Sequence, residues 1–223
     1  MNKTEITLLY LWEIKKRSLP YALWHMAIDR LALRFDKDIA FFKSIGTGSG
    51  KTFTPKDASA TRWGLVLTIN ADAVSRFDNG KVVKSWRKIS GSEFRATMQP
   101  SSSSGKWSGA EPVLPASEIG GLPIAALTRA RIKWSMNPKF WRAVPAVTLA
   151  LHDSAGLIGA IGIGEAPIGL QGTFSIWKDG QSLRNFAYKS EAHISAIEGT
   201  QRNNWYSEEL FARFEILEMR GQF

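Results

Sequence analysis

The glycine pattern Ile-Gly-x-Gly occurs twice in the chain, in SIGTG (44–48) and in AIGIG (160–164). The two stretches are separated by 160 − 44 = 116 residues. A second match has almost the same offset, because Ser92-Glu93 and Ser207-Glu208 are separated by 207 − 92 = 115 residues. Two matches at almost the same spacing predict that the chain repeats a structural unit.

The residues around the first glycine stretch follow the order strand, helix, strand, strand, helix, strand. In the first helix, Leu23, Met26, Ala27 and Leu31 recur at helical spacing behind an early Pro20. A short helix is expected between residues 71 and 86, before a connector rich in Ser, Gly and Pro. The expected strands and first helix are 5–16 (strand), 19–34 (helix), 38–48, 62–70 and 92–99 (strands).

The residues around the second glycine stretch repeat this order. Pro138 lies near the start of the first helix of this half, where proline is favoured. The expected elements are 122–134 (strand), 137–152 (helix), 157–167 and 172–177 (strands), 191–199 (helix) and 207–219 (strand).

Two consecutive βαββαβ units predict an α+β fold made of two ferredoxin-like units. The predicted boundaries are 1–100 for the first unit, 101–121 for the connector and 122–223 for the second unit. Each sheet has one face covered by helices and one bare face. Packing the two bare faces together gives a dimeric α+β barrel-like architecture within one chain.

Neither glycine stretch is interpreted as a nucleotide-binding motif, and GTGSG (46–50) is interpreted as the place where a strand turns. A P-loop needs glycine where this chain has Ile45, and a helix beginning at Lys51, where none is expected. The spacing Gly162-x-Gly164-x-x-Pro167 also differs from a dinucleotide fingerprint. Glycine permits the positive φ that such turns need.

The composition is that of a folded globular protein, with 44% apolar and 22% charged residues. The chain contains no cysteine, which excludes disulfides, thiolate metal sites and iron–sulfur clusters. The N-terminal residues lack the pattern of a signal peptide, and the least polar long window, 143–164, is interrupted by His152 and Asp153. These observations predict a cytoplasmic protein.

The net charge of +9 is concentrated in the first half. Residues 1–120 contain 18 Lys and Arg against 11 Asp and Glu, whereas residues 121–223 contain 11 against 9. No nucleic-acid-binding signature accompanies the charge, so nucleic acid is not expected as a partner. Two explanations of the basic first half stay open: a solvated basic surface, and a peripheral contact at the inner surface of an anionic membrane.

Histidine is scarce, and His193 is the candidate for chemistry among the three in the chain. In SEAHISAIEG, His193, Ala196 and Ile197 share one helical face, which predicts an imidazole directed at the sheet. Two roles remain open for it: a hydrogen-bonded core residue, or a single axial ligand of haem iron in an apolar pocket. His25 and His152 are expected at the surface or at a helix end.

Several long strings in this order resemble the spheroidene monooxygenase family of carotenoid biosynthesis. The similarity is dense from Gly121 to Phe214 and sparser in the first half, where IGTGSGKTFTP (45–55) and RWGLVL (62–67) carry it. The strings of the second half are GLPIAALTRARI (121–132), FWRAVPAV (140–147), IGIGEAPIGLQGTFSIW (161–177), FAY (186–188) before His193, and WYSEELFARF (205–214).

The resemblance implies an oxygenase that acts on the end group of an acyclic carotenoid. Two hydroxylations at one carbon would give a geminal diol, which loses water to leave a ketone. The resemblance also implies haem as the cofactor. Since the chain has no flavin or nicotinamide motif, an external electron donor such as reduced ferredoxin is expected as a partner.

The resemblance also implies roles for individual residues. His193 matches the position of the iron ligand. Arg129, Arg131 and Arg213 are candidates to bind the haem propionates, and strand alternation would let only some of them face inward. The residues expected to line the channel for an apolar substrate are Phe174, Trp177 and Tyr188.

Two other functions share the same fold. One is a non-catalytic protein that binds haem or another apolar ligand, which would consume no O₂ with any electron donor. The other is a haem-free oxygenase, which would keep its activity after the substitution His193→Ala.

Overall fold

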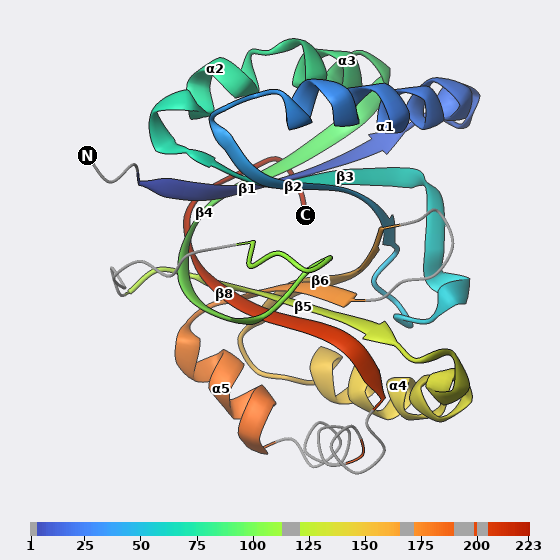
Figure 1. Cartoon of the computed structure of the whole chain (residues 1–223). Helices are drawn as coiled ribbons and strands as arrows, with labels where there is room; N and C mark the ends of the chain where they lie inside the picture. Colours follow the sequence, from blue (N-terminus) through green and yellow to red (C-terminus); the bar gives the residue numbers. More distant parts are fainter. Residues whose placement is uncertain (1–3, 113–120, 166–171, 190–198, 200–204) are drawn as a thin grey trace.

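A computed structural model describes residues 4–112, 121–165, 172–189, 199 and 205–223. It has the two helical layers and the strands between them that Figure 1 shows. Helices α1, α2 and α3 cover one side of the strands, and α4 and α5 cover the other.

The first half of the chain forms four strands and three α-helices. Three short 3₁₀ helices accompany them at Lys16–Ser18 (η1), Pro55–Asp57 (η2) and Ala71–Ala73 (η3). The main elements are β1 (Glu5–Ile14), α1 (Leu19–Arg34), β2 (Ile39–Gly48), β3 (Ala58–Asn70), α2 (Val74–Asp78), α3 (Lys81–Ile89) and β4 (Ser90–Gly105).

The second half forms four further strands, with two α-helices among the described residues. The 3₁₀ helix η4 (Trp134–Met136) precedes its first α-helix, as η1 precedes α1. The main elements are β5 (Ile124–Ile132), α4 (Asn137–His152), β6 (Leu157–Gly164), β7 (Gly172–Trp177), α5 (Gly180–Lys189) and β8 (Tyr206–Arg220).

The eight strands form a closed barrel in the order β1-β3-β2-β6-β7-β5-β8-β4. The order β4-β1-β3-β2 in the first half equals β8-β5-β7-β6 in the second, which confirms the predicted α+β class and the repeat of a ferredoxin-like unit. One junction between the halves is long, with β4 pairing along β8 from Arg95↔Arg220 to Gly105↔Leu210.

The other junction between the halves is short, and the two glycine stretches form it. Strands β2 and β6 pair at Gly46↔Gly164 and Thr47↔Ile163. The repeated pattern that indicates the fold therefore also closes the barrel.

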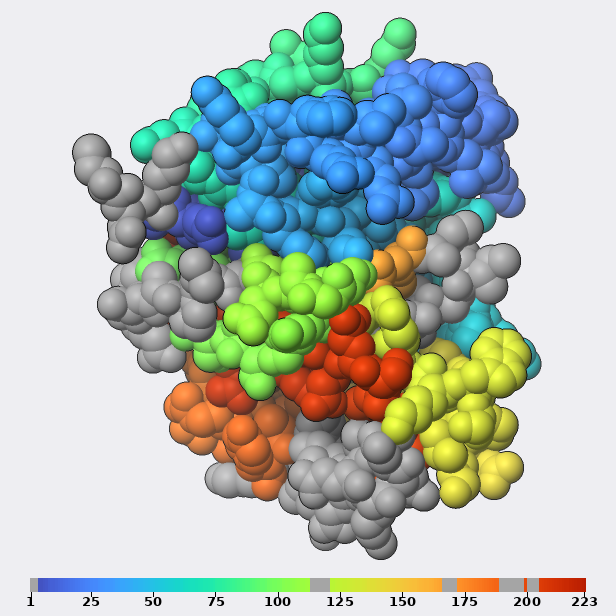
Figure 2. Space-filling model, viewed as in Figure 1, coloured from blue at the N-terminus to red at the C-terminus, as the bar shows by residue number. Residues whose placement is uncertain are grey.

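The barrel interior is filled by apolar side chains from both halves. Strand alternation directs one residue in two inward. Figure 2 shows the first half of the chain in the upper part of the molecule and the second half in the lower part, so the shared interior lies between them. The buried set includes Leu9, Leu11, Ile45, Val66, Phe94, Met98, Leu127, Ile161, Ile163, Phe174, Ile176 and Phe214.

Several strand ends differ from the predicted ones by one to four residues, and three differences change an element. Strand β4 continues to Gly105, into the predicted connector 101–121, because Ser102 to Gly105 pair with β8. The helix expected between 71 and 86 is divided into η3, α2 and α3. Helix α5 was not predicted, and the helix predicted at 191–199 falls outside the described residues except for Gly199.

Helix α1 has the predicted bounds, but its apolar stripe faces solvent. Leu23, Ala27 and Leu31 are exposed, whereas Ala22, Leu33, Asp29 and His25 are buried against the sheet. The expectation of a surface or helix-end position is therefore wrong for His25, whose Nδ1 lies 3.1 Å from Asp29 Oδ1. It is confirmed for His152, which is exposed at the end of α4.

No described helix has both the length and the apolar character needed to cross a bilayer.

Candidate functional site

The outer face of the second half of the barrel is lined largely by small and polar side chains. Since Ala125, Leu127, Phe174 and Ile176 point into the barrel, their alternate neighbours point toward α4 and α5. This outer face, called here the second face, consists of Ile124, Ala126, Thr128, Ala130, Ala160, Gly162, Thr173, Ser175, Trp177, Phe211, Arg213 and Glu215.

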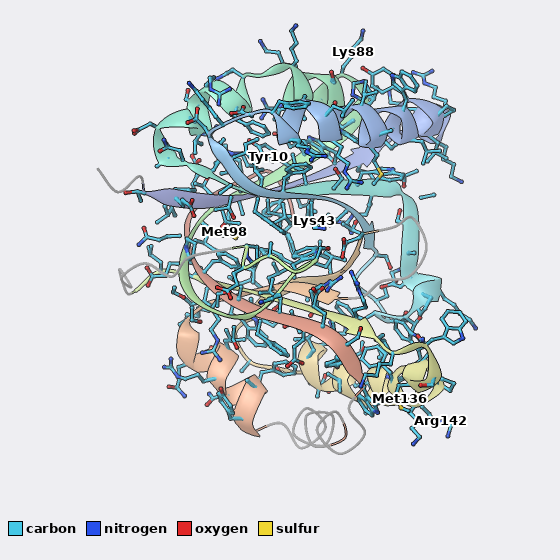
Figure 3. The ribbon with its side chains drawn as sticks, viewed as in Figure 1. Tyr10, Lys43, Lys88, Met98, Met136 and Arg142 are labelled. Carbon is cyan, nitrogen blue, oxygen red and sulfur yellow. The ribbon has the colours of Figure 1, made fainter. Side chains whose placement is uncertain are left out.

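The corresponding outer face of the first half is filled by large side chains. Tyr10 and Trp12 from β1 stack with ring centroids 5.2 Å apart, and Trp12 stacks on Trp86 of α3 at 5.2 Å. Figure 3 shows Tyr10 between β1 and the helices above it. Ala126, Thr128 and Ala130 on β5 therefore have far less volume than the residues of the same strand position in β1.

A small apolar cluster covers part of the second face. Trp177 is fully buried, stacks on Phe186 of α5 at 5.4 Å, and donates its indole N–H to Ser175 Oγ at 2.9 Å. Leu151 from α4 and Leu183 from α5 pack in the same cluster. Helices α4 and α5 thus exclude water from one edge of the second face, where most side chains are small.

Two ionisable residues of β8 share the second face. Arg213 is half-buried, and Glu215 is buried. Burying charged groups costs free energy unless they are paired. The second face therefore has one half-buried positive group and one buried negative group, two positions apart on β8.

A separate ion-pair cluster lies inside the barrel around Arg129. This buried guanidinium contacts Glu165 Oε1 at 2.6 Å and also donates to Glu208. Lys43 Nζ of β2 binds Glu165 Oε2 at 3.0 Å. Burial raises the pKa of Glu165, but the hydrogen bond from Lys43 and the charge of Arg129 outweigh this effect and hold its pKa below the ordinary value.

Residues Trp107 to Gly109 attach the segment after β4 to this cluster. The backbone N–H groups of Ser108 and Gly109 donate to Glu208 at 2.9 and 2.7 Å. Burial raises the pKa of Glu208, and these hydrogen bonds, together with Arg129, lower it more strongly. The Arg129 guanidinium also lies 5.8 Å from the Trp107 ring centroid, a cation–π distance.

The GTGSGKTFTP stretch is held by Asp57, which explains why it is no phosphate loop. The Asp57 carboxylate accepts the backbone N–H groups of Lys51, Thr52 and Phe53 at 3.0 to 3.3 Å, and also the Ser49 hydroxyl. Burial raises the pKa of Asp57, but these hydrogen bonds lower it below its ordinary value. The donors that a P-loop offers to phosphate are occupied by a side chain here.

A cavity of about 460 Å³ opens toward the barrel interior. Phe94, Ile161 and Ile176 belong both to its lining and to the buried interior, and Phe223 packs against Phe94 with ring centroids 4.9 Å apart. The cavity is apolar on this side and has the size of a small-molecule pocket.

The structure separates the predicted arginines. Arg129 points into the barrel, and Arg131 is exposed at the same rim, 3.9 Å from Glu208. Arg213 lies on the opposite side of the strands, on the second face. His193 lies outside the described residues, so its role stays a prediction.

The predicted channel residues are also not brought together. Phe174 is in the barrel interior, and Trp177 is on the second face because three positions along a strand change the side. Tyr188 on α5 is exposed. Trp177 and Arg213 are thus the two described candidates that share one face.

Sequence reasoning missed Asp57, Glu165 and Lys43. Glu165 follows the second glycine stretch directly, but only the pairing of β2 with β6 brings Lys43 next to it. Among the described residues, no three His, Asp or Glu side chains gather as a metal-binding group.

Comparison with curated proteins identifies the family. The chain is 33% identical over 229 residues to spheroidene monooxygenase of Cereibacter sphaeroides, with 100% of this chain and 69% of that protein covered. It is 35% identical over 211 residues to spheroidene monooxygenase of Rhodobacter capsulatus, with 92% and 87% covered. The chain belongs to the spheroidene monooxygenase family.

Membership of the spheroidene monooxygenase family confirms the resemblance seen in the sequence, and it makes this chain an oxygen-dependent monooxygenase. No family model matches the chain.

Among solved structures, an aldoxime dehydratase in complex with butyraldoxime is similar with a TM-score of 0.57. The identity is 9%, and the match covers 96% of this chain and 79% of that one. At this identity the similarity supports the fold alone.

Proposed function

We propose that this monooxygenase is haem-dependent and oxidises the end group of an acyclic carotenoid to a ketone. The second ferredoxin-like unit, residues 122–223, would carry the haem. The observation that supports this proposal best is the second face, where β5 and β7 have much smaller side chains than the corresponding strands of the first half.

The residues present fit a haem group on the second face. Ala126, Thr128 and Ser175 lie where the first half has large side chains, and small side chains at these positions favour contact with a flat ring. The half-buried guanidinium of Arg213 suits a propionate. Arg129 suits it less well, because it points into the barrel and is already paired with Glu165.

The chemistry of the proposal balances with an external reductant. Each hydroxylation consumes one O₂, two electrons and two protons, inserts one oxygen atom into a C–H bond and releases the other as water. A second hydroxylation at the same carbon gives a geminal diol, which loses water to form the ketone. Haem would supply the redox chemistry that activates O₂, and a donor protein such as reduced ferredoxin would supply the electrons.

The chain's own residues would bind and shield the reactants. Trp177, Leu151 and Leu183 exclude water from one edge of the second face. His193 would hold the haem iron, the role that the family resemblance implies. A dry, apolar surrounding favours both a hydrocarbon substrate and tight binding of the ring.

A haem titration of the purified protein, followed by absorption spectroscopy, tests the cofactor. The wild type should give a saturable Soret band at one haem per chain, and His193→Ala should shift or abolish it. His152→Ala is the matched control, because His152 is exposed, and its spectrum should equal that of the wild type. Equal spectra for all three proteins, or no saturable binding, would contradict the proposal.

The substrate is tested by co-expression with a pathway that makes acyclic carotenoids. The proposal expects oxo products with the wild type and none with His193→Ala. An unchanged pigment profile from soluble, haem-loaded protein would refute the carotenoid assignment.

The two other functions give different results in the same experiments. A haem-free oxygenase would form the oxo product after His193→Ala. A non-catalytic binding protein would take up haem stoichiometrically and consume no O₂ with a reduced donor.

A further inference from the structure

Helix α1 is apolar on both of its sides. Its inner side packs on the barrel through Ala22 and Leu33. Its outer side exposes Trp24 by 63%, Leu31 by 59% and the adjoining Phe35 by 81%. A helix that is apolar all round is normally buried, and patches of large exposed apolar residues mark contact surfaces.

Basic side chains surround this apolar ridge. Residues 15–37 and 71–88 contain eleven Lys and Arg against four Asp and no Glu. On α3, which packs beside α1 in the same layer, the exposed residues Lys81, Lys84 and Lys88 recur along the outer face. Figure 3 shows Lys88 projecting away from the body of the molecule on this side.

Three of the four acidic residues of this layer bind partners other than the lysines of α3. Asp29 is buried beneath α1, next to His25. Asp36 binds Arg76 through two hydrogen bonds of 2.9 Å. Asp78 binds Arg87 at 2.8 Å, so the lysines of α3 keep their charge toward solvent.

We propose that the outer surface of α1 and α3 docks on an anionic lipid bilayer. The ridge formed by Leu23, Trp24, Leu31 and Phe35 would enter the boundary between headgroups and acyl chains, while the lysines of α3 contact lipid phosphates. A convex apolar ridge beside a row of lysines has the form of an interfacial helix. The proposal rests on surface chemistry and is independent of the proposed haem site.

The opposite helical layer provides an internal control. Helix α4 has the same length as α1 and also exposes apolar residues, Leu149 by 66% and Trp134 of η4 by 92%. At the sixth position of the helix, however, α4 has Arg142 where α1 has Trp24. Figure 3 shows Arg142 at the outer side of α4.

The test is co-sedimentation of the full chain with vesicles of phosphatidylcholine alone or with phosphatidylserine added. The wild type should bind the anionic vesicles at low salt and release them as salt is raised. The double variant Trp24→Ser/Leu31→Ser and the triple variant Lys81→Glu/Lys84→Glu/Lys88→Glu should each weaken binding by about tenfold or more. The control Trp134→Ser/Leu149→Ser should bind like the wild type.

Each other outcome contradicts the proposal. Equal losses for the control and the α1 variant would assign the binding to exposed apolar surface in general. Absence of vesicle binding by the wild type would overturn it directly. A wild-type dimer that Trp24→Ser/Leu31→Ser converts to a monomer, without vesicle binding, would make a second copy the occupant of the ridge. Circular dichroism and thermal unfolding of each variant verify that it is folded.

Discussion

The two halves of the barrel share one strand order but differ in how the outer faces of their strands are filled. In the first half, Tyr10, Trp12 and Trp86 form a continuous aromatic stack between strand and helix. In the second half, Ala126 and Thr128 take the central strand positions. The first half thus fills the layer between strand and helix with large aromatic rings, whereas the second half has much smaller side chains at the corresponding positions.

This difference also shows where binding energy can come from. Where side chains already fill the layer between a sheet and its helices, that layer has no volume for a cofactor. Where the layer has small residues, the free protein makes fewer packing contacts, and a bound ring would supply such contacts and stabilise the protein. Substitutions in the two halves should therefore have opposite consequences for stability and for ligand binding.

The largest effect is expected from Trp12→Ala in the first half. Trp12 is buried, stacks on two rings and donates its indole N–H to Glu93 at 2.7 Å. Its truncation should lower the free energy of unfolding by about 3 to 5 kcal/mol. Urea unfolding measures this, with Trp134→Ala as the exposed control, expected within about 0.5 kcal/mol of the wild type. Similar values for both variants would refute the role assigned to the stack.

A smaller loss is expected from Glu208→Gln in the second half. The backbone N–H groups of Ser108 and Gly109 bind different oxygens of the Glu208 carboxylate, so Gln keeps an acceptor for only one of them and also removes the charge that faces buried Arg129. The free energy of unfolding should fall by about 2 kcal/mol. The neighbouring residue Glu209 is exposed on the other side of the strand. The control Glu209→Gln should therefore change the free energy of unfolding little.

Acidification should destabilise both halves together. Asp57 and Asp78 in the first half, and Glu165 and Glu208 in the second, have folded-state pKa values below their ordinary ones. Each therefore contributes stability that is fully present above its ordinary pKa and is lost as the pH falls through the folded value. The melting temperature should drop as the pH is lowered from about 5 to about 3. A flat profile there would contradict these assignments.

The smallest effect on stability is expected from Ala126→Phe on the second face. If that face has free space, the ligand-free protein should lose less than about 1 kcal/mol, whereas haem binding should weaken by about tenfold or more. Ala22→Phe is the matched substitution on the filled side, where the site is fully buried. It should cost about 1 to 3 kcal/mol. Equal costs at the two sites would remove the distinction between the halves.

The sequence predicts the architecture well, because repeated patterns fix strand order. The bounds of α1, α4 and β7 agree with those expected from sequence. Helix α5 was missed, since GQSLRNFAYK lies between a strand and the expected helix. Strand β4 was ended early, since its serines form a strand only by pairing with β8.

The candidate site is less predictable, because it depends on which strand residues face the same side. Alternation alone separates Phe174 from Trp177, but it does not tell which of them faces the helices. The cluster of Lys43, Glu165 and Arg129 requires the closure of β2 against β6, which no local pattern encodes. The division of the chain at residues 100 and 121 stays a prediction.

The two junctions that close the barrel differ greatly in length, so they should differ in stability. Ten residue pairs join β4 to β8 at the long junction, and two pairs join β2 to β6 at the short junction. Glycines make up one of these two pairs, and the ion pair of Lys43 with Glu165 adds a side-chain contact beside them. Thermal opening of this protein should therefore start at the short junction, with the amide hydrogens that bridge β2 and β6 exchanging earlier than those that bridge β4 and β8.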